Sequence, residues 1–258
     1  MSLATLKTKV EQLIVKAQNG GGDFVKNLIE GNFTTLNIDV ATIRTYAFKN
    51  CTKLTKVVAP NVTAIASYAF DGCTNLTEVS FPSISYFSGT CCFNNCKSLV
   101  SVDMPNMYIA PNQAFANSGL TEIHFESLRI IDPMVFMNCK SATSIYLPKL
   151  EKVNNSAFSN CTGLTEITFY KVMTSFVNTA FSGCTNIESV TIPEGWNISC
   201  YFHYSEKLTR ESLHAMIENL ADMSTAETAP TFQIGSTNFA KLDEEHIAML
   251  DTKGWVTA

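Results

Sequence analysis

A phenylalanine recurs along this chain every 21 to 23 residues, usually directly after an alanine. The seven positions are Phe48, Phe70, Phe93, Phe115, Phe136, Phe158 and Phe181. The third residue after each is a cysteine or, once, a serine: Cys51, Cys73, Cys96, Ser118, Cys139, Cys161 and Cys184. A unit of about 22 residues is too short to bury its own apolar face, so this period predicts units that stack on one another around a continuous core.

Each unit also carries a short alternating run, such as Val79-x-Phe81. Five of these runs end at a proline: Pro60, Pro82, Pro105, Pro148 and Pro193. Alternation predicts a short strand with one buried face, and proline ends a strand because it has no amide proton to donate. The rest of each unit must return the chain to the start of the next strand. The pattern therefore predicts a solenoid with a parallel sheet and a file of phenylalanine rings inside.

The full spacing, Leu-x-x-Val-x-Phe-Pro-x-Ile followed by Ala-Phe-x-x-Cys-x-x-Leu, resembles the BspA-type leucine-rich repeat from about Leu36 to Pro193. The resemblance implies an α/β fold: a right-handed solenoid with a parallel sheet of short strands and an irregular convex side. It also implies bacterial or protist surface proteins that bind host components, and similar repeats occur in phage-encoded proteins. The resemblance implies a cell-surface or secreted location. The sequence itself adds no support for it, because residues 1–18 contain no apolar stretch typical of a signal peptide.

Three segments are expected: an N-terminal helix and cap over residues 1–35, the solenoid over 36–195, and a small α+β cap over 196–258. Apolar residues at helical spacing predict a helix within residues 1–18. In the C-terminal segment, Thr209 and Asp243 are expected to cap two helices, with a short strand at residues 231–234 between them. Gly254 is expected to end the second helix.

Composition narrows the possible functions. Lys and Arg number 18 against 23 Asp and Glu, which gives a formal net charge of −5. A protein that binds nucleic acid through phosphates needs a basic surplus, so no nucleic-acid partner is expected. No run of 18 apolar residues occurs, so no membrane insertion is expected either.

No sequence motif indicates a cofactor, a metal or an enzyme. The chain has no Walker loop, no H-E-x-x-H and no C-x-x-C. Its four histidines are His124, His203, His214 and His246, and none has a recognisable nucleophile partner in the sequence. His214 and His246 fall in helical patterns, and we expect them to be surface or cap residues.

Nine cysteines allow two interpretations. In one, stacked coils bring the sulfurs of the repeated cysteine position close together, within reach of disulfides. Alternatively, each cysteine is a small buried hydrophobic residue that lines a turn. Ser118 takes this position in one coil, so pairing is not required there, and buried thiols are favoured. Cys200, outside the repeats, is the expected free thiol.

Strand alternation points to one candidate binding surface on the concave sheet. Most outward positions after Val79 and its equivalents carry Ser, Thr or Pro, but the middle coils depart from this pattern. The departing residues are Asp103, Glu122, His124, Glu126, Tyr146 and Tyr170. Tyrosines flanked by polar groups are typical contact residues, whereas Thr and Tyr are also simply good strand formers on a solvated sheet. His124 is expected beside Asp103 and Tyr146 in adjacent coils.

Taken together, these features favour a non-enzymatic binding module that presents its concave sheet to a protein or glycan ligand, in bacterial surface adhesion or host interaction. The alternative is a structural or phage tail-associated accessory protein, attached through its N-terminal helix. A third hypothesis is an enzyme in the C-terminal segment that uses His203, His214 or His246; it lacks any paired catalytic motif.

Overall fold

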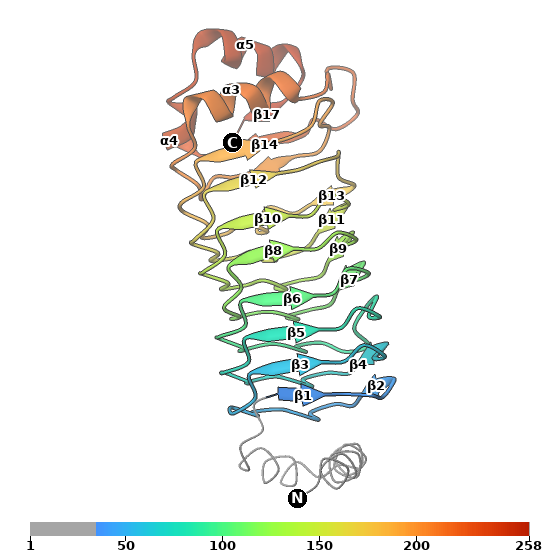
Figure 1. Cartoon of the computed structure of the whole chain (residues 1–258). Helices are drawn as coiled ribbons and strands as arrows, with labels where there is room; N and C mark the ends of the chain where they lie inside the picture. The colour runs from blue at the N-terminus through green and yellow to red at the C-terminus, as the bar shows by residue number, and fades with distance from the viewer. Residues whose placement is uncertain (1–34, 258) are drawn as a thin grey trace, which may run out of the picture.

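The structure, a computed structural model, describes residues 35–257. The helix expected within residues 1–18 lies outside the described residues. Successive coils of the chain stack into a long ladder, with β1 at one end and the helices α3 and α5 at the other (Figure 1). Each coil contributes a rung, and the elements run in sequence order along the stack.

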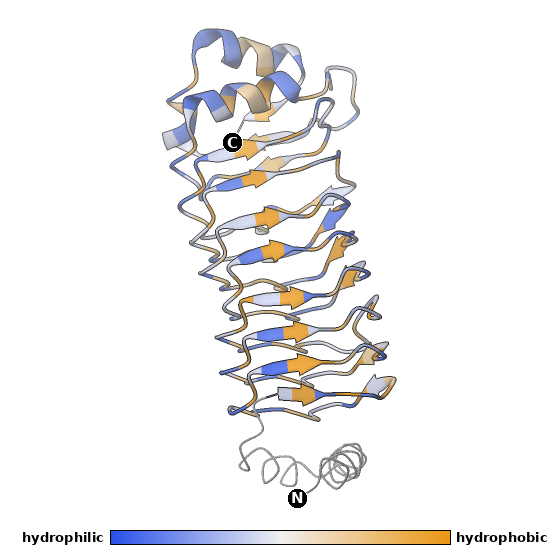
Figure 2. Cartoon of the chain, viewed as in Figure 1, coloured by the Kyte–Doolittle hydropathy of each residue, from blue (hydrophilic) through white to orange (hydrophobic). Residues whose placement is uncertain are grey.

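One side of the ladder is a row of three-residue strands that pair in parallel. The strands are β1 (Thr35–Asn37), β3 (Lys56–Val58), β5 (Glu78–Ser80), β6 (Ser101–Asp103), β8 (Glu122–His124), β10 (Ser144–Tyr146), β12 (Glu166–Thr168) and β14 (Ser189–Thr191). Hydrogen bonding joins β1-β3-β5-β6, β8-β10 and β12-β14. In every strand but β3, whose Val57 is followed by Val58, the apolar middle residue is flanked by more polar residues (Figure 2), as the alternation predicted; Val79, for example, is fully buried. We call the outward side of this row the strand face.

A second parallel row, which the sequence did not predict, runs along another side of the coils. Its two-residue strands are β2 (Thr42–Ile43), β4 (Ala64–Ile65), β7 (Ile109–Ala110), β9 (Ile130–Ile131), β11 (Lys152–Val153) and β13 (Ser175–Phe176). They pair as β2-β4 and β7-β9-β11-β13. Where both rows are continuous, adjacent coils are joined by strand pairing on two sides; where the first row breaks, at β6/β8 and β10/β12, the pairs β7-β9 and β11-β13 of the second row still join the coils.

The predicted file of phenylalanine rings forms the interior of the stack. Each of the seven repeated rings stacks on the next, with ring centroids 4.8 to 5.7 Å apart and interplanar angles of 14° or less. All seven side chains are buried. Because each ring packs between its neighbours in adjacent coils, the core is continuous along the ladder and no coil buries its aromatic residue alone.

The repeated cysteines lie beside this file as thiols. The Sγ of Cys73, Cys96, Cys139, Cys161 and Cys184 each donates to the carbonyl of the phenylalanine 24 to 26 residues earlier, at 3.0 to 3.3 Å. All nine cysteines are free and buried. Cys200 was expected to stand apart as the free thiol, but in this respect it is like the other eight. Burial raises the pKa of Cys51 to about 12 and that of Cys139 to about 11.

The second residue after each repeated phenylalanine has a left-handed backbone conformation, with a positive φ. Asn50, Asn95, Asn117, Asn138 and Asn160 have φ near +60°, and Gly72 and Gly183 take the equivalent position in the other two coils. The Asn138 amide donates to Asn117 at 2.9 Å, and Asn160 donates to Asn138 at 3.1 Å. Asparagine tolerates this conformation better than most residues. At Gly72 a Cβ would lie 2.2 Å from the Asn50 Oδ1, so a larger residue there would require the Asn50 side chain to move.

The hydrogen-bonded row of three-residue strands is interrupted at two places, between β6 and β8 and between β10 and β12. The first break coincides with a change in the sequence. The turn just before β8 is one residue shorter than in the other coils, reading Ser118-Gly119-Leu120 where the preceding coil has Cys96-Lys97-Ser98-Leu99. A Cβ on Gly119 would lie 2.2 Å from the Lys97 carbonyl oxygen. The short turn therefore requires glycine. It lies next to the break between β6 and β8.

The solenoid contacts extend beyond the boundary at residue 195 that the sequence suggested. Phe202, Ser205 and Leu208 repeat the Phe-x-x-Cys-x-x-Leu spacing, and all three are buried. The Phe202 ring lies 5.8 Å from that of Phe181, and the Ser205 hydroxyl donates to the Cys184 carbonyl at 3.0 Å. This coil was missed because serine replaces cysteine and no alanine precedes the phenylalanine.

The segment from β15 onward, which includes this coil, covers the end of the stack. It contains β15 (Cys200–Tyr201), α3 (Arg210–Asn219), β16 (Thr231–Gln233), α4 (Ser236–Phe239), α5 (Glu244–Thr252) and β17 (Val256–Thr257). Thr209 and Asp243 cap α3 and α5, and Gly254 has a φ of +73°, as predicted. α3 lies against β14, where the Ser212 hydroxyl bonds to Val190. No helix among residues 35–257 is both long and apolar enough to cross a bilayer.

Candidate functional site

Three rings follow one another across adjacent coils of the strand face; His124 and Tyr170 are exposed, and Tyr146 between them is partly buried. His124 ends β8, Tyr146 ends β10, and Tyr170 follows β12. The ring centroids of His124 and Tyr146 are 4.8 Å apart, and those of Tyr146 and Tyr170 are 5.4 Å apart with the rings edge to face. Glu122 and Glu126 flank His124. We call these five residues the aromatic–acidic patch.

The position of His124 follows from strand alternation and from two carboxylates. In β8, Ile123 points into the core, so Glu122 and His124 both point outward. The Nε2 of His124 lies 3.1 Å from Glu126 Oε1, and its Nδ1 lies 3.5 Å from Glu122 Oε1. All three side chains are about half exposed. The patch is therefore an open surface that offers hydrogen bonds and ring faces to a ligand.

The structure separates Asp103 from this group, contrary to the expectation that it lies beside His124. The Asp103 carboxylate instead accepts a hydrogen bond from the Ser80 hydroxyl in the preceding coil at 2.6 Å. Asp103 on β6 and His124 on β8 lie on opposite sides of the break between these two strands. Five of the six predicted residues thus come together, and the sixth belongs to the neighbouring part of the strand face.

The strand face is acidic around the patch. From β5 to β14, the three-residue strands contain Glu78, Asp103, Glu122 and Glu166 but no lysine or arginine. The lysine of this row, Lys56 on β3, donates to Glu78 at 2.6 Å. The carboxylates near the patch consequently have no basic strand neighbour that would neutralise them.

A second aromatic cluster lies in the turns of the first coils and was not predicted. The rings of Tyr46 and Tyr68 stack with centroids 5.3 Å apart, and the Lys49 ammonium lies 5.2 and 5.1 Å from their centroids. Lys49 also forms an ion pair with Asp71 at 3.0 Å. Both tyrosines directly precede an Ala-Phe pair, 22 residues apart, so the repeat alignment contained the signal.

In the C-terminal segment, the structure brings together two histidines that the sequence placed on separate helices. His214 on α3 and His246 on α5 stack with ring centroids 3.6 Å apart, and Asp243 contacts both. His246 is buried rather than a surface residue. Hydrogen bonds from the His246 amide and ring and from Arg210 hold the pKa of Asp243 well below its usual range. Nothing in the sequence indicated this cluster, because the two histidines are brought together by the packing of α3 on α5.

Comparisons with known proteins agree with this fold. The structure resembles a leucine-rich repeat protein from Bacteroides ovatus, with a TM-score of 0.57 and 23% identity over 79% of this chain and 52% of that one. It also resembles one from Eubacterium ventriosum, with a TM-score of 0.55 and 25% identity over 63% of this chain and 44% of that one. The chain thus spans about half the length of these two proteins. Among proteins of curated function, none matches the sequence.

The model of the BspA type leucine rich repeat region matches residues 26–143 and 129–243, with six copies. These matches cover most of the chain, and they include the aromatic–acidic patch. The name of the family describes a repeat architecture. By this match and by the stacked coils described above, the chain belongs to the BspA-type leucine-rich-repeat family.

Proposed function

We propose that this chain is a non-enzymatic binding module that holds a protein or glycan ligand on its strand face, at the aromatic–acidic patch. The observation that carries the proposal is the row of three rings in contact on adjacent coils, of which His124 and Tyr170 are exposed and Tyr146 is partly buried. Elsewhere on the face, positions equivalent to His124 and Tyr146 carry smaller residues such as Ser80 and Thr191. Exposed aromatic residues surrounded by polar groups are enriched in protein contacts.

The shape of the surface suits a macromolecular ligand. Parallel strands on adjacent coils give an extended face, and its residues offer scattered polar contacts instead of a deep cavity. Tyrosine supplies a large contact area at a low cost in side-chain entropy, since it has only two side-chain torsions. Membership of a repeat family of interaction and surface modules supports the same function, with a role in adhesion or host interaction at a bacterial surface.

The charge of the face favours a ligand with basic or neutral contacting groups. Glu122, Glu126 and Glu166 are all exposed, with no lysine or arginine on the strands from β5 to β14. Such a surface attracts cations over several ångströms and repels anions. Tyrosine faces also attract lysine and arginine side chains. We therefore favour a protein ligand with exposed basic residues, or a neutral glycan, over sulfated or sialylated glycans.

A binding screen with matched variants tests the proposal. The purified chain is immobilised and exposed to host matrix proteins and to arrays of neutral and anionic glycans. Tyr170→Ala removes a patch ring that is 48% exposed, and Tyr86→Ala removes a ring that is 47% exposed near the second row of strands. We expect Tyr170→Ala to weaken binding about tenfold or more, as for a residue near the centre of an interface, and Tyr86→Ala to leave it nearly unchanged. Equal effects of the two substitutions would remove the patch from the proposal.

The alternative, a structural or phage tail-associated accessory protein, depends on the N-terminal helix. That helix lies outside the described residues, and no described residue favours attachment over ligand binding. It stays a prediction that deletion of residues 1–18 tests. A lower mass in solution after the deletion would support attachment or oligomerisation through this segment.

A further inference from the structure

The break between β6 and β8 uncovers apolar side chains beside the aromatic–acidic patch. From β3 to β14, the middle residue of each three-residue strand is buried except for Val102 on β6 and Ile145 on β10, which are partly exposed. Each of these two strands precedes a break in the row. At the second break β10 and β12 still lie against each other, whereas β6 and β8 are more widely separated (Figure 1). Val100, just before β6, is 43% exposed.

The backbone of β6 also has unpaired groups at this break. Consecutive carbonyls of a strand point to opposite neighbours. The Asp103 carbonyl accepts from the Phe81 amide, on the β5 side, at 2.8 Å. The N–H and C=O of Val102 therefore point toward β8, but no strand pairing joins β6 to β8, and no described residue bonds to these two groups. Within the strand face, β6 is thus an edge strand.

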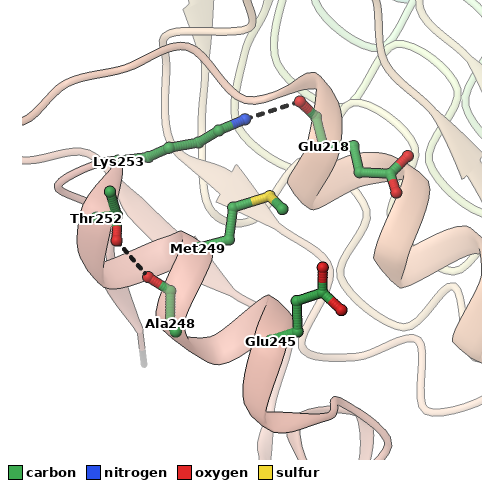
Figure 3. A pocket seen from close by; sticks show the side chains of 6 residues that line it. All are labelled: Glu218, Glu245, Ala248, Met249, Thr252 and Lys253. Atoms are coloured by element: carbon green, nitrogen blue, oxygen red, sulfur yellow. Dashed lines mark hydrogen bonds between the residues drawn. The ribbon is translucent and has the colours of Figure 1, made fainter.

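The end of the stack shows how the chain covers the same groups when they are satisfied from within. Val190 on β14 takes the position of Val102; its amide donates to the Ser212 hydroxyl at 2.8 Å, and its carbonyl accepts from that hydroxyl at 3.3 Å. The carbonyls at the end of α3 are covered too, because the Lys253 ammonium donates to three of them beside a shallow pocket (Figure 3). No described side chain covers the edge of β6 in this way.

Acidic side chains lie on both sides of the break. Asp103 ends β6, Glu122 begins β8 and Glu126 follows it, and all three are exposed. The Asp103 carboxylate bonds to a neutral partner, the Ser80 hydroxyl, so its charge is not neutralised there. A segment that binds along this edge is therefore favoured by lysine or arginine side chains and disfavoured by acidic ones.

We propose that the ligand of the strand face is an extended polypeptide segment with basic residues, whose backbone pairs with the free edge of β6. This inference rests on the proposed function and narrows its ligand to a protein. Strand addition takes its affinity from main-chain hydrogen bonds and its selectivity from alternate side chains. Apolar side chains of the segment cover Val100 and Val102, and basic ones reach Asp103 and Glu122. A glycan cannot take this place, because it has no repeating N–H and C=O groups at the spacing of a strand.

The test uses the full chain and a fluorescent synthetic peptide in which lysine alternates with valine and threonine. Two further peptides of the same sequence carry N-methyl groups on one or the other set of alternate backbone nitrogens, and a fourth has glutamate in place of lysine. Only one edge of the segment pairs with β6, so one N-methylated peptide should bind about tenfold more weakly than the parent peptide and the other should not. The glutamate peptide should also bind at least about tenfold more weakly in a fluorescence anisotropy titration.

Amide hydrogen exchange measures the pairing directly. In the free chain, the Val102 amide should exchange faster than the Val79 amide, which lies inside the paired part of the row. Addition of the unmodified peptide should slow the exchange of Val102 and leave that of Val79 unchanged.

Variants locate the binding at the break. A lysine inserted between Ser118 and Gly119 gives this turn the length that it has in the preceding coil, so β8 should pair with β6 and peptide affinity should fall at least about tenfold. Asp103→Asn keeps an acceptor for Ser80 and removes the charge, so it should weaken binding severalfold without changing the melting temperature. Glu227→Gln, in an exposed loop of the C-terminal segment, is the matched control and should bind as the parent chain does. If the insertion prevents folding, Asp103→Asn and hydrogen exchange still decide the question.

Three results would overturn the proposal: equal affinity of all four peptides, a Val102 amide as protected as that of Val79 in the free chain, or equal affinity of Asp103→Asn and Glu227→Gln. Binding of a glycan that depends on Tyr170, without binding of the peptides, would reject strand addition and leave the proposed function standing. Absence of any ligand whose binding depends on Tyr170 or Asp103 would reject both.

Discussion

Replacing Phe158 by alanine removes one ring from the middle of the phenylalanine file. The side chain is fully buried, and its centroid lies 5.4 Å from that of Phe136 and 4.8 Å from that of Phe181. Phenylalanine-to-alanine changes in protein cores cost about 3–5 kcal/mol, and each lost ring pair adds about 0.5–1.5 kcal/mol. Because Phe158 loses two such pairs at a site held on both sides by adjacent coils, we expect about 4–5 kcal/mol. This is a large share of the ~5–15 kcal/mol that stabilises a typical domain.

Urea denaturation measures this loss with two probes. Far-UV circular dichroism follows the strands, and fluorescence follows the two buried tryptophans, Trp255 and Trp196, the latter 5.2 Å from the Phe169 ring. Phe158→Leu keeps most of the volume and should lose about 1.5 kcal/mol or less. Tyr146→Ala, on the strand face, should lose less than about 1 kcal/mol. A loss below about 2 kcal/mol for Phe158→Ala, or one equal to that of Tyr146→Ala, would refute the assignment of the inner and outer faces.

Further measurements test other parts of the structure. A thiol reagent at pH 8 should label almost none of the nine cysteines in the folded chain and all nine after unfolding; rapid labelling of several native thiols would contradict their burial. Burial raises the thiol pKa to about 12 for Cys51 and about 11 for Cys139, so as pH rises these thiols lose their protons in the unfolded chain before they do so in the folded chain. The free energy of unfolding should therefore fall as pH rises above about 9. A free energy of unfolding that does not change over this pH range would argue against buried thiols. Gly119→Ala should lower stability by about 1–3 kcal/mol, since the new methyl group meets the Lys97 carbonyl; an unchanged melting temperature would show that the short turn can relax. Thr209→Ala should cost about 1 kcal/mol through loss of the α3 cap, and no change by thermal melting would exclude a stabilising cap.

The repeat spacing alone was enough to predict the solenoid, its parallel strands and the interior ring file. These features could be predicted because a phenylalanine, a cysteine and an alternating apolar pair recur at a nearly constant spacing. Each coil must bury the same face as its neighbour, so the same residue types recur at the buried positions. The helix caps Thr209 and Asp243 could also be predicted from the sequence, because the start of a helix depends on a few consecutive residues. The continuation through Phe202 was missed because α3, and not an alternating run, follows Leu208, and because neither the alanine nor the cysteine of the repeat is present there.

Only the tertiary structure decided which side chains meet across coils and helices. Asp103 and His124 are separated where a turn one residue shorter interrupts the strand row, and no rule of periodicity predicts how a ladder responds to such a deletion. His214 and His246 meet because α3 lies on the last coil and α5 lies on α3, a packing that depends on apolar surfaces and not on spacing. Sequence determined the repeated unit because its contacts are periodic. The end of the stack and the sites on it depend on contacts that occur once, so they could be seen only in three dimensions.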